Sequence, residues 1–407
     1  MKCIKRYLIS ILLLSAAAGA FAIDIEYGGL ATSTLSAEGD SIEASCKTNL
    51  NTKAKQELTG WLKFPITKDE KLSFAGQGSI VTEYIQKYEK DKQTKIGFDL
   101  DLFKVTYLEK MSADSTCSVS FGRFKYSHLT NVVFSQKNDG VLLRFDASKV
   151  KLGLYGGYTG LLNQQNVKIL NEDGDNYRKI DEDLKWYEHL YEWADPYVTT
   201  SFVMSFPYLF LNQTVAFEIS SFFGAKGPAY ERALEYNRYY ATLSFSGPLA
   251  PKLSYALATT MFTEKFNHLG NLTQLSFTYN TGFKNASISL SGVYASGDGN
   301  GPFSRFLAFT SSSATYALDA PEYSGLMKIG TSVALKPLPC LYTSVGTDVV
   351  FFCKERFIDD HDGWQWYAAA KLQCTNDFSI TLSEFRYYSN DSVRDNGGAT
   401  LKVALAF

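Results

Sequence analysis

Apolar and polar residues alternate with a period of two along most of this chain, and no helical period is sustained. The final segment shows the pattern most clearly. Its apolar face carries Leu401, Val403, Leu405 and Phe407, and its other face carries Thr400, Lys402, Ala404 and Ala406. Because successive side chains of a β-strand point to opposite faces, this alternation predicts strands with one apolar and one polar face. The pattern as a whole predicts an all-β protein.

About eighteen such strands can be placed along the chain, and most reach the length of about 9–11 residues that a tilted strand needs to cross a bilayer. The predicted strands are 24–34, 54–64, 71–84, 96–107, 116–124, 139–146, 149–160, 196–206, 208–222, 236–246, 252–263, 271–280, 284–296, 325–335, 341–353, 364–373, 378–388 and 398–407.

The connections between these strands alternate in length. The short ones lie near 65–70, 108–115, 146–149, 206–208, 247–251, 280–284, 336–340 and 374–377. The long ones include 35–53, 85–95, 125–138, 161–195, 223–235, 297–324 and 389–397. Transmembrane barrels have short periplasmic turns and longer extracellular loops. The chain is therefore predicted to be a single antiparallel transmembrane β-barrel. A soluble β-solenoid or a pair of β-sandwiches is the alternative, but neither explains the alternating loop lengths.

Prolines and aromatic residues fit the same map. Proline cannot donate to a sheet ladder, and every proline of the chain falls in or beside a predicted turn or loop. Aromatic side chains gather toward the predicted strand ends, where the two interfaces of a membrane would lie.

The N-terminus has the features of an export signal. Lys2, Lys5 and Arg6 precede a short apolar run, and Ala20-Phe21-Ala22 resembles a cleavage site. Residues 1–22 are therefore predicted to be a signal peptide and residues 23–407 an outer-membrane β-barrel. Cys3 precedes the apolar run, so lipidation is not expected.

Composition excludes several classes of partner. The net charge is only −2, so no nucleic acid or other polyanion is implied. The chain holds 6 cysteines, too few and too scattered for a disulfide scaffold. Cys340 and Cys374 are predicted to lie close together at one end of a hairpin. Two free thiols are the favoured interpretation there, and a disulfide is the alternative. No cofactor is expected.

Charged residues within the predicted strands mostly fall opposite the apolar face. In a barrel of this size the polar face encloses an aqueous lumen. The residues predicted to line it are Asp99, Asp101, Arg144, Lys151, Glu218, Arg238, Lys328, Asp348, Lys371 and Lys402. Arg123, Glu384 and Arg386 are exceptions, because they share the parity of apolar neighbours.

The loop 161–195 is the most distinctive connection. It is acidic and aromatic, and its candidate constriction residues are Glu172, Asp173, Asp175, Trp186 and Trp193. Three interpretations stay open: a loop that folds into the pore and constricts it, a lid that captures a cation or another ligand, and a solvated surface loop.

Histidines give little support for metal binding or catalysis. His128, His189, His268 and His361 all fall in predicted external loops, and no two have the spacing of metal ligands. Ser127 precedes His128 directly, but adjacent residues on a strand point apart, so a hydrolase is the less favoured alternative. An adhesin-type barrel is the other, because long external loops suit binding.

Four short motifs carry a family resemblance: Phe121-Gly122-Arg123, Asp139-Gly140-Val141, Ser296-Gly297-Asp298-Gly299 and the terminal Leu405-Ala406-Phe407. With the strands placed, the chain resembles bacterial outer-membrane porins of the eighteen-stranded, alginate-export-like type.

The resemblance implies passive diffusion of small hydrophilic solutes, such as sugars or organic ions, through a barrel in outer-membrane lipid. It also implies that Phe407 belongs to a signal read by the barrel assembly machinery, and it leaves a homo-oligomer open. The alginate-export type is expected to have an arginine-rich lumen. Only Arg144 and Arg238 are predicted to face inward here, so general or solute-selective diffusion is favoured over polyanion export.

Overall fold

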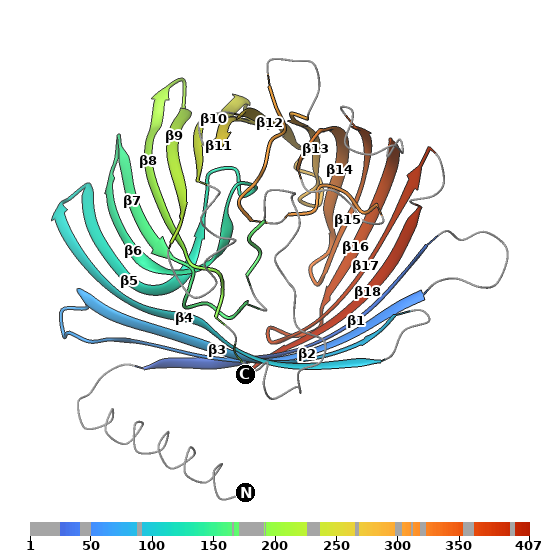
Figure 1. The fold of residues 1–407 in the computed structure, drawn as a ribbon, viewed down its shortest axis with the longest axis horizontal. Helices are drawn as coiled ribbons and strands as arrows, with labels where there is room; N and C mark the ends of the chain where they lie inside the picture. The colour runs from blue at the N-terminus through green and yellow to red at the C-terminus, as the bar shows by residue number, and fades with distance from the viewer. Residues whose placement is uncertain are drawn as a thin grey trace, which may run out of the picture.

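A computed structural model shows one closed sheet of 18 antiparallel strands. Each strand pairs with its neighbours in chain order, and β1 also pairs with β18, which closes the ring (Figure 1). The structure describes residues 25–40, 50–87, 92–164, 167–170, 191, 193–225, 237–264, 268–297, 303–310, 312–317, 323–352, 362–390 and 395–407. Within these ranges, no helix has the length and apolar character needed to span a membrane.

The bounds of the first nine strands are β1 Glu26–Asp40, β2 Leu50–Pro65, β3 Leu72–Gln86, β4 Gln93–Ser112, β5 Ser115–Ser127, β6 Ser135–Ala147, β7 Lys151–Tyr158, β8 Tyr197–Phe210 and β9 Gln213–Gly224. The other nine are β10 Arg238–Ala250, β11 Leu253–Glu264, β12 His268–Asn280, β13 Ser287–Ala295, β14 Leu326–Leu338, β15 Leu341–Phe352, β16 Gly363–Gln373, β17 Phe378–Ser389 and β18 Asn396–Ala406. Each predicted strand overlaps one of these, so the predicted all-β antiparallel barrel is confirmed.

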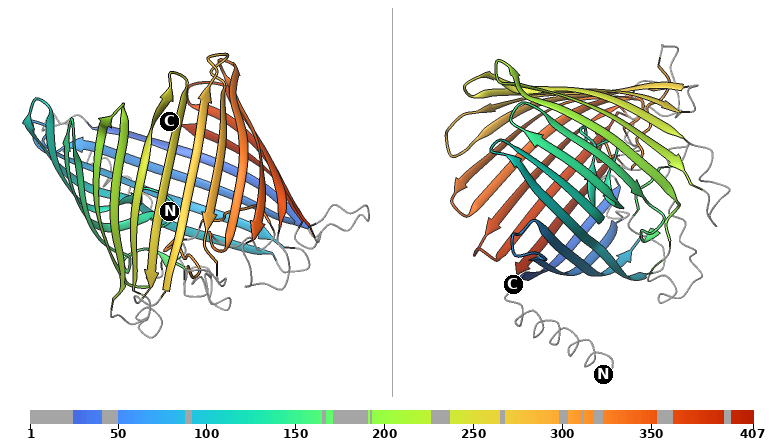
Figure 2. Two further views of the ribbon diagram at one scale, coloured as in Figure 1. Left: turned by 90° about the horizontal axis from the view of Figure 1, so that it is seen from above. Right: turned by 90° about the vertical axis from the view of Figure 1, so that its left-hand side faces the viewer.

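The strands are long and strongly tilted in the side views (Figure 2). Large apolar side chains cover their outer face. Ile80 and Leu154 are each 52% exposed, and Leu382 is 55% exposed. In water this exposure would be costly, but an exposed apolar belt is typical of barrels that lie in lipid.

One predicted turn is wrong. The turn between β8 and β9 was expected at 206–208, yet β8 continues through Pro207 and the chain reverses at Leu211 and Asn212, whose φ angles are 47° and 61°. The β8–β9 register breaks between Phe206 and Phe210. A proline is tolerated within a strand where a bulge interrupts the ladder, so Pro207 marks an irregularity rather than the turn.

The C-terminal residue closes the barrel. Gly29 N donates to Phe407 O at 2.7 Å, and Phe407 N donates to Gly29 O at 3.0 Å. A Cβ atom on Gly29 would lie 2.4 Å from the Phe407 ring, so the glycine makes room for it. The seam between β1 and β18 therefore depends on both residues.

Candidate functional site

The outer ends of β5 and β6 leave the wall of the barrel. Pairing between β4 and β5 stops at Phe103 and Arg123, and β6 pairs with β7 only from Asp139 onward. β5 and β6 nevertheless stay paired with each other as far as Ser127 and Ser135. Residues 124–138, called the inner hairpin below, thus have no backbone pairing with either neighbouring strand.

Gly122 makes this departure possible. Its φ is +115°, and a Cβ atom there would lie 2.0 Å from the Phe103 carbonyl oxygen. Glycine adopts such a conformation without steric cost, whereas other residues do not. The inner hairpin therefore begins just after Gly122, whose backbone can turn away from β4.

The inner hairpin packs with other connections inside the ring of strands, where Figure 1 shows the segments before β6 and before β14. Phe309 N donates to Val133 O at 2.9 Å, and Leu170 N donates to Phe309 O at 3.0 Å. Together with wall residues these segments form an apolar cluster: Val132, Val133, Phe134, Leu162, Val167, Ile169, Leu170, Ala194, Tyr197, Phe222, Tyr240, Phe262, Leu272, Ala295, Phe306, Leu307, Ala308, Phe309, Ala314 and Leu326. The described segments therefore narrow the lumen with a packed core.

The loop 161–195 contributes its two ends to this core. Asn163 and Trp193 form an isolated bridge, and Ala194 N donates to Leu162 O at 3.0 Å. Trp193 itself is 66% exposed. The other candidate constriction residues, Glu172, Asp173, Asp175 and Trp186, lie outside the described residues. The inward course is therefore observed for the ends of the loop, while the role of its acidic part stays a prediction.

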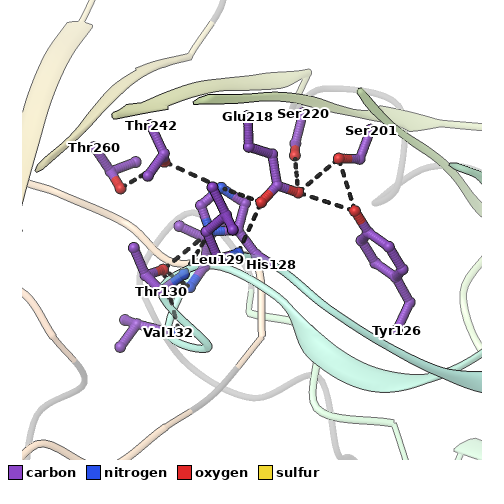
Figure 3. Close-up of polar contacts among 11 residues, drawn as sticks. Tyr126, His128, Leu129, Thr130, Val132, Ser201, Glu218, Ser220, Thr242 and Thr260 are labelled. Carbon is purple, nitrogen blue, oxygen red and sulfur yellow. Dashed lines mark hydrogen bonds and ion pairs between the residues drawn. The ribbon is translucent and has the colours of Figure 1, made fainter. Parts of the chain in front are cut away.

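Glu218 anchors the inner hairpin to the wall (Figure 3). It comes from β9 and is 0% exposed. One carboxylate oxygen accepts hydrogen bonds from Ser201 at 2.6 Å, Tyr126 at 3.0 Å and Ser220 at 3.1 Å. The other accepts from the backbone N of Leu129 at 2.7 Å. Because a buried carboxylate is tolerated only when its oxygens are bonded, these four donors fix the hairpin against β8 and β9.

His128 lies at the tip of the inner hairpin and is 1% exposed. Its Nε2 is 3.6 Å from Glu218 and 3.1 Å from the Thr242 hydroxyl, while its Nδ1 is within 3.2 Å of Thr130 N. It was expected in an external loop, so its position inside the barrel is a correction. Ser127 bonds to Ser135 rather than to His128, and no group of three or more potential metal ligands is found in the described part of the chain. His268 is also corrected, since it begins β12.

Arg238 and Glu264 form a second buried link between wall and loops. Arg238 is 1% exposed and donates to Glu264 at 3.0 Å. It also donates to the carbonyl oxygens of Leu170 and Ala308, both at 3.1 Å. Loop residues therefore cover both Glu218 and Arg238, and their predicted role in lining a pore stays a prediction.

A third set of charges faces the other side of the inner hairpin. Lys137 lies 2.6 Å from Asp99 and forms a second ion pair with Asp101. Arg123 donates to Asp139 at 2.8 Å and to the Leu161 carbonyl at 2.6 Å. Arg123 lies on the face of β5 that points outward in the wall. The bend at Gly122 turns this face toward the lumen, so the Arg123 side chain reaches polar partners there.

Lys328 and Asp348 border a cavity of about 610 Å³ between residues 313–317 and the wall. Lys328 donates to the Ala314 carbonyl at 2.8 Å and lies 3.9 Å from Asp348. Gln365 bonds to Asp348 at 2.6 Å and accepts from Tyr316 N at 2.9 Å. The remaining lining includes Glu38 and the rings of Tyr316, Tyr367 and Phe385. Polar groups beside aromatic faces can hold a small hydrophilic solute.

The other four predicted residues, Arg144, Lys151, Lys371 and Lys402, are exposed. Lys371 shares the parity of Gln365 and Tyr367, which line the cavity, and Lys402 lies opposite Thr381 on the same face. Arg144 and Lys151 share the parity of buried Leu142 and Tyr155. The exposed charges of the predicted set are thus all cations, whereas its acids are paired or largely covered.

Glu384 and Arg386, the other two charged residues on the apolar face of a predicted strand, lie on the outward face of β17. Glu384 is exposed on the same face as Leu382, and Arg386 donates to the Tyr388 hydroxyl at 3.4 Å. Long side chains near an interface can reach polar surroundings in this way. Cys340 and Cys374 are both free thiols at neighbouring strand ends, where Gln373 N donates to Cys340 O at 2.8 Å.

Sequence reasoning missed the inner hairpin and therefore the roles of Arg123, His128 and Lys137. The signal was present in the glycines of Phe121-Gly122-Arg123 and Asp139-Gly140-Val141, which face each other across β5 and β6. A Cβ atom on Gly140 would lie 2.3 Å from the Gly156 carbonyl oxygen. Paired glycines inside a strand mark close backbone approach or a bend.

Comparison with known proteins supports the fold alone. No family model matches the sequence, and no curated protein is similar to it. Among solved structures, Pseudomonas aeruginosa OccK5 (OpdH) has a TM-score of 0.60 at 14% identity, covering 94% of this chain and 98% of its own. The P. aeruginosa outer membrane protein OpdK has a TM-score of 0.61 at 9% identity, with coverage of 94% and 98%. P. aeruginosa OccK2 (OpdF), solved in complex with glucuronate, has a TM-score of 0.56 at 11% identity, again covering 94% and 98%. This chain therefore shares its fold with these P. aeruginosa proteins, of which OpdK is an outer-membrane protein.

Proposed function

We propose that this protein is an outer-membrane channel for the passive diffusion of small hydrophilic solutes. The observation that carries the proposal is the reversal of polarity across the barrel wall. Apolar side chains are exposed on the outside, and charged and hydroxylated side chains lie on the inside beside the apolar cluster. A closed sheet of 18 strands is wide enough to enclose water, and the inward segments leave a polar cavity of about 610 Å³.

The proposed orientation follows from loop length. The short turns would face the periplasm and the long connections the exterior, as in other transmembrane barrels. Assembly through the barrel machinery, contact with outer-membrane lipid and a homo-oligomeric state belong to the same proposal. The signal peptide over residues 1–22 falls outside the described residues and stays a prediction.

The solutes that fit best are small and neutral or anionic. Arg144, Lys151, Lys371 and Lys402 would line the water-filled part of the lumen, and their exposure leaves them available to a passing solute. OccK2, which shares the fold, was solved with glucuronate, a sugar acid. The alginate-export-like type stays a prediction, and the small number of inward arginines favours small solutes over a polyanion.

Single-channel recording of refolded protein in a planar bilayer tests the proposal. Discrete conductance steps that glucose or glucuronate partly blocks are expected. An adhesin-type barrel with a closed lumen would insert without conducting. A hydrolase would release product from an ester or phosphodiester substrate, and neither outcome is compatible with the channel proposal.

A further inference from the structure

We propose that Glu218 and His128 form a proton-sensitive latch that holds the inner hairpin in the lumen, and that protonation of His128 releases the hairpin and widens the channel. The widening rests on the proposed channel function, but the latch itself does not. Figure 3 shows the residues involved.

The carboxylate joins two parts of the molecule that the barrel wall leaves separate. Ser201 and Ser220 donate to Glu218 from β8 and β9. Tyr126 and the backbone of Leu129 donate to it from the inner hairpin, at 3.0 Å and 2.7 Å. Since β4 and β7 do not pair with residues 124–138, these contacts hold the hairpin together with its apolar packing and the Lys137 ion pairs. Loosening them would weaken the docking of a segment that lies in the lumen.

The tautomer of His128 follows from its neighbours. Thr130 N donates to Nδ1 at 3.2 Å, so Nδ1 acts as an acceptor in this contact, and the Thr130 hydroxyl, which can donate or accept, lies 3.0 Å from the same nitrogen. The neutral ring then has its proton on Nε2, which faces Thr242 at 3.1 Å and Glu218 at 3.6 Å. A second proton would go on Nδ1, where it could donate to the Thr130 hydroxyl at 3.0 Å but would break the hydrogen bond from Thr130 N. The docked turn therefore favours the neutral imidazole.

The charged and titratable groups around His128 do not offset the cost of protonating its ring. Glu218 from β9 is the nearby charge that favours a protonated ring. Tyr126 from β5 donates to Glu218 and stacks on Tyr155 from β7 at 3.9 Å, and β10 presents the Thr242 hydroxyl to His128. Arg238 on β10 and Glu264 on β11 are engaged with each other at 3.0 Å. Burial lowers the pKa of His128 below its usual range, and the opposing effect of Glu218 is smaller.

The direction of the pH effect follows from linkage. The docked hairpin holds His128 neutral, while a released hairpin exposes it to water with an ordinary pKa of about 6.5. The released form binds the proton more readily, so the docked form is fully favoured above about pH 6.5 and loses that advantage as the pH falls below it. One proton changes the docked-to-released ratio by at most about tenfold per pH unit.

The first experiment is single-channel recording at about pH 7.5 and about pH 5, on either side of the ordinary histidine pKa. The wild type should show up to a tenfold rise in the ratio of wide to narrow conductance states for each pH unit below about 6.5. His128→Gln should lose this response because glutamine does not titrate in this range. His268→Gln, a change at the exposed start of β12, should keep it. A pH response that His128→Gln retains would overturn the latch.

The second experiment measures release of the inner hairpin without requiring that the barrel conducts ions. Hydrogen exchange of the Leu129 and Val133 amides in the folded wild-type barrel is measured at both pH values and corrected for the intrinsic rate. Faster exchange at the lower pH supports release, and unchanged protection refutes it even if His128→Gln fails to assemble. Should exchange show release while no conductance is seen, the latch would stand and the channel proposal would fail.

Discussion

Lys137 Nζ lies 2.6 Å from Asp99 Oδ2. Asp99 is 6% exposed and belongs to the inner face of β4. Lys137, by its position along β6, would be expected on the same outer face as the lipid-facing Val141. The two residues meet because the inner hairpin turns the outer side of β5 and β6 toward β4. This contact and the Glu218 cluster lie on opposite sides of the same hairpin. The hairpin is thus held from both sides across the lumen.

Removing the bend should destabilise the barrel. Gly122→Ala places a Cβ atom 2.0 Å from the Phe103 carbonyl in a left-handed conformation, and such strain costs about 1–3 kcal/mol. The midpoint of heat-induced unfolding in detergent should fall. Gly60→Ala is the matched control, because nothing lies within 4 Å of its Cβ position. Equal midpoints for the two variants would contradict a special role for Gly122.

The Lys137 ion pairs should be coupled to hairpin docking. Lys137→Met leaves Asp99 and Asp101 without their cation, so the charge of the lumen becomes more negative and ion selectivity should shift toward cations. Asp99→Asn alone removes one acid, and the double variant should recover part of the lost stability. A double-mutant cycle is expected to give a coupling energy on the order of 1 kcal/mol, reduced because the Lys137 side chain is 36% exposed. Purely additive effects would mean that the pairs do not hold the hairpin.

The exposed cations should set a weak anion preference. Lys371→Gln and Lys402→Gln together remove two inward charges, and the reversal potential under a salt gradient should shift toward that of a non-selective pore. Lys68→Gln, in the turn before β3, serves as the control. If the control shifts the reversal potential as much as the double variant does, the inner-face cations do not determine the ion selectivity.

Loss of the terminal residue should impair closure of the barrel. Deleting Phe407 removes the backbone hydrogen bonds to Gly29 and the ring that packs on it. The amount of folded protein in the outer membrane should fall, while Phe407→Tyr keeps the ring and should assemble. Wild-type amounts of the truncated chain would argue against both the seam and the proposed assembly signal.

The sequence predicted the strands well because each strand has one side in an apolar surrounding, and period-two alternation records that directly. It failed at Pro207, where a bulge carries the strand past a residue that normally ends one. The inward direction of Arg123 and Lys137 was also not predicted. Alternation along a strand predicts which face a residue is on only while that strand stays in the wall of the barrel. The bend at Gly122 depends on a backbone angle that alternation does not encode. The partners of Glu218 likewise come from strands and loops far apart in the chain, which a pattern along one segment does not reveal.

Whether the barrel is a channel is decided by the reversal potential of single channels under a salt gradient. We expect the wild type to conduct, with a weak anion preference at low salt that fades as the Debye length shrinks to about 8 Å at physiological ionic strength. A variant lacking residues 171–190, which keeps Leu170 in the core, should keep this preference because the inner-face cations remain. A cation-selective wild type that loses its selectivity on this deletion would assign selectivity to the acidic loop. A wild type that inserts as a folded barrel but never conducts would contradict the channel account.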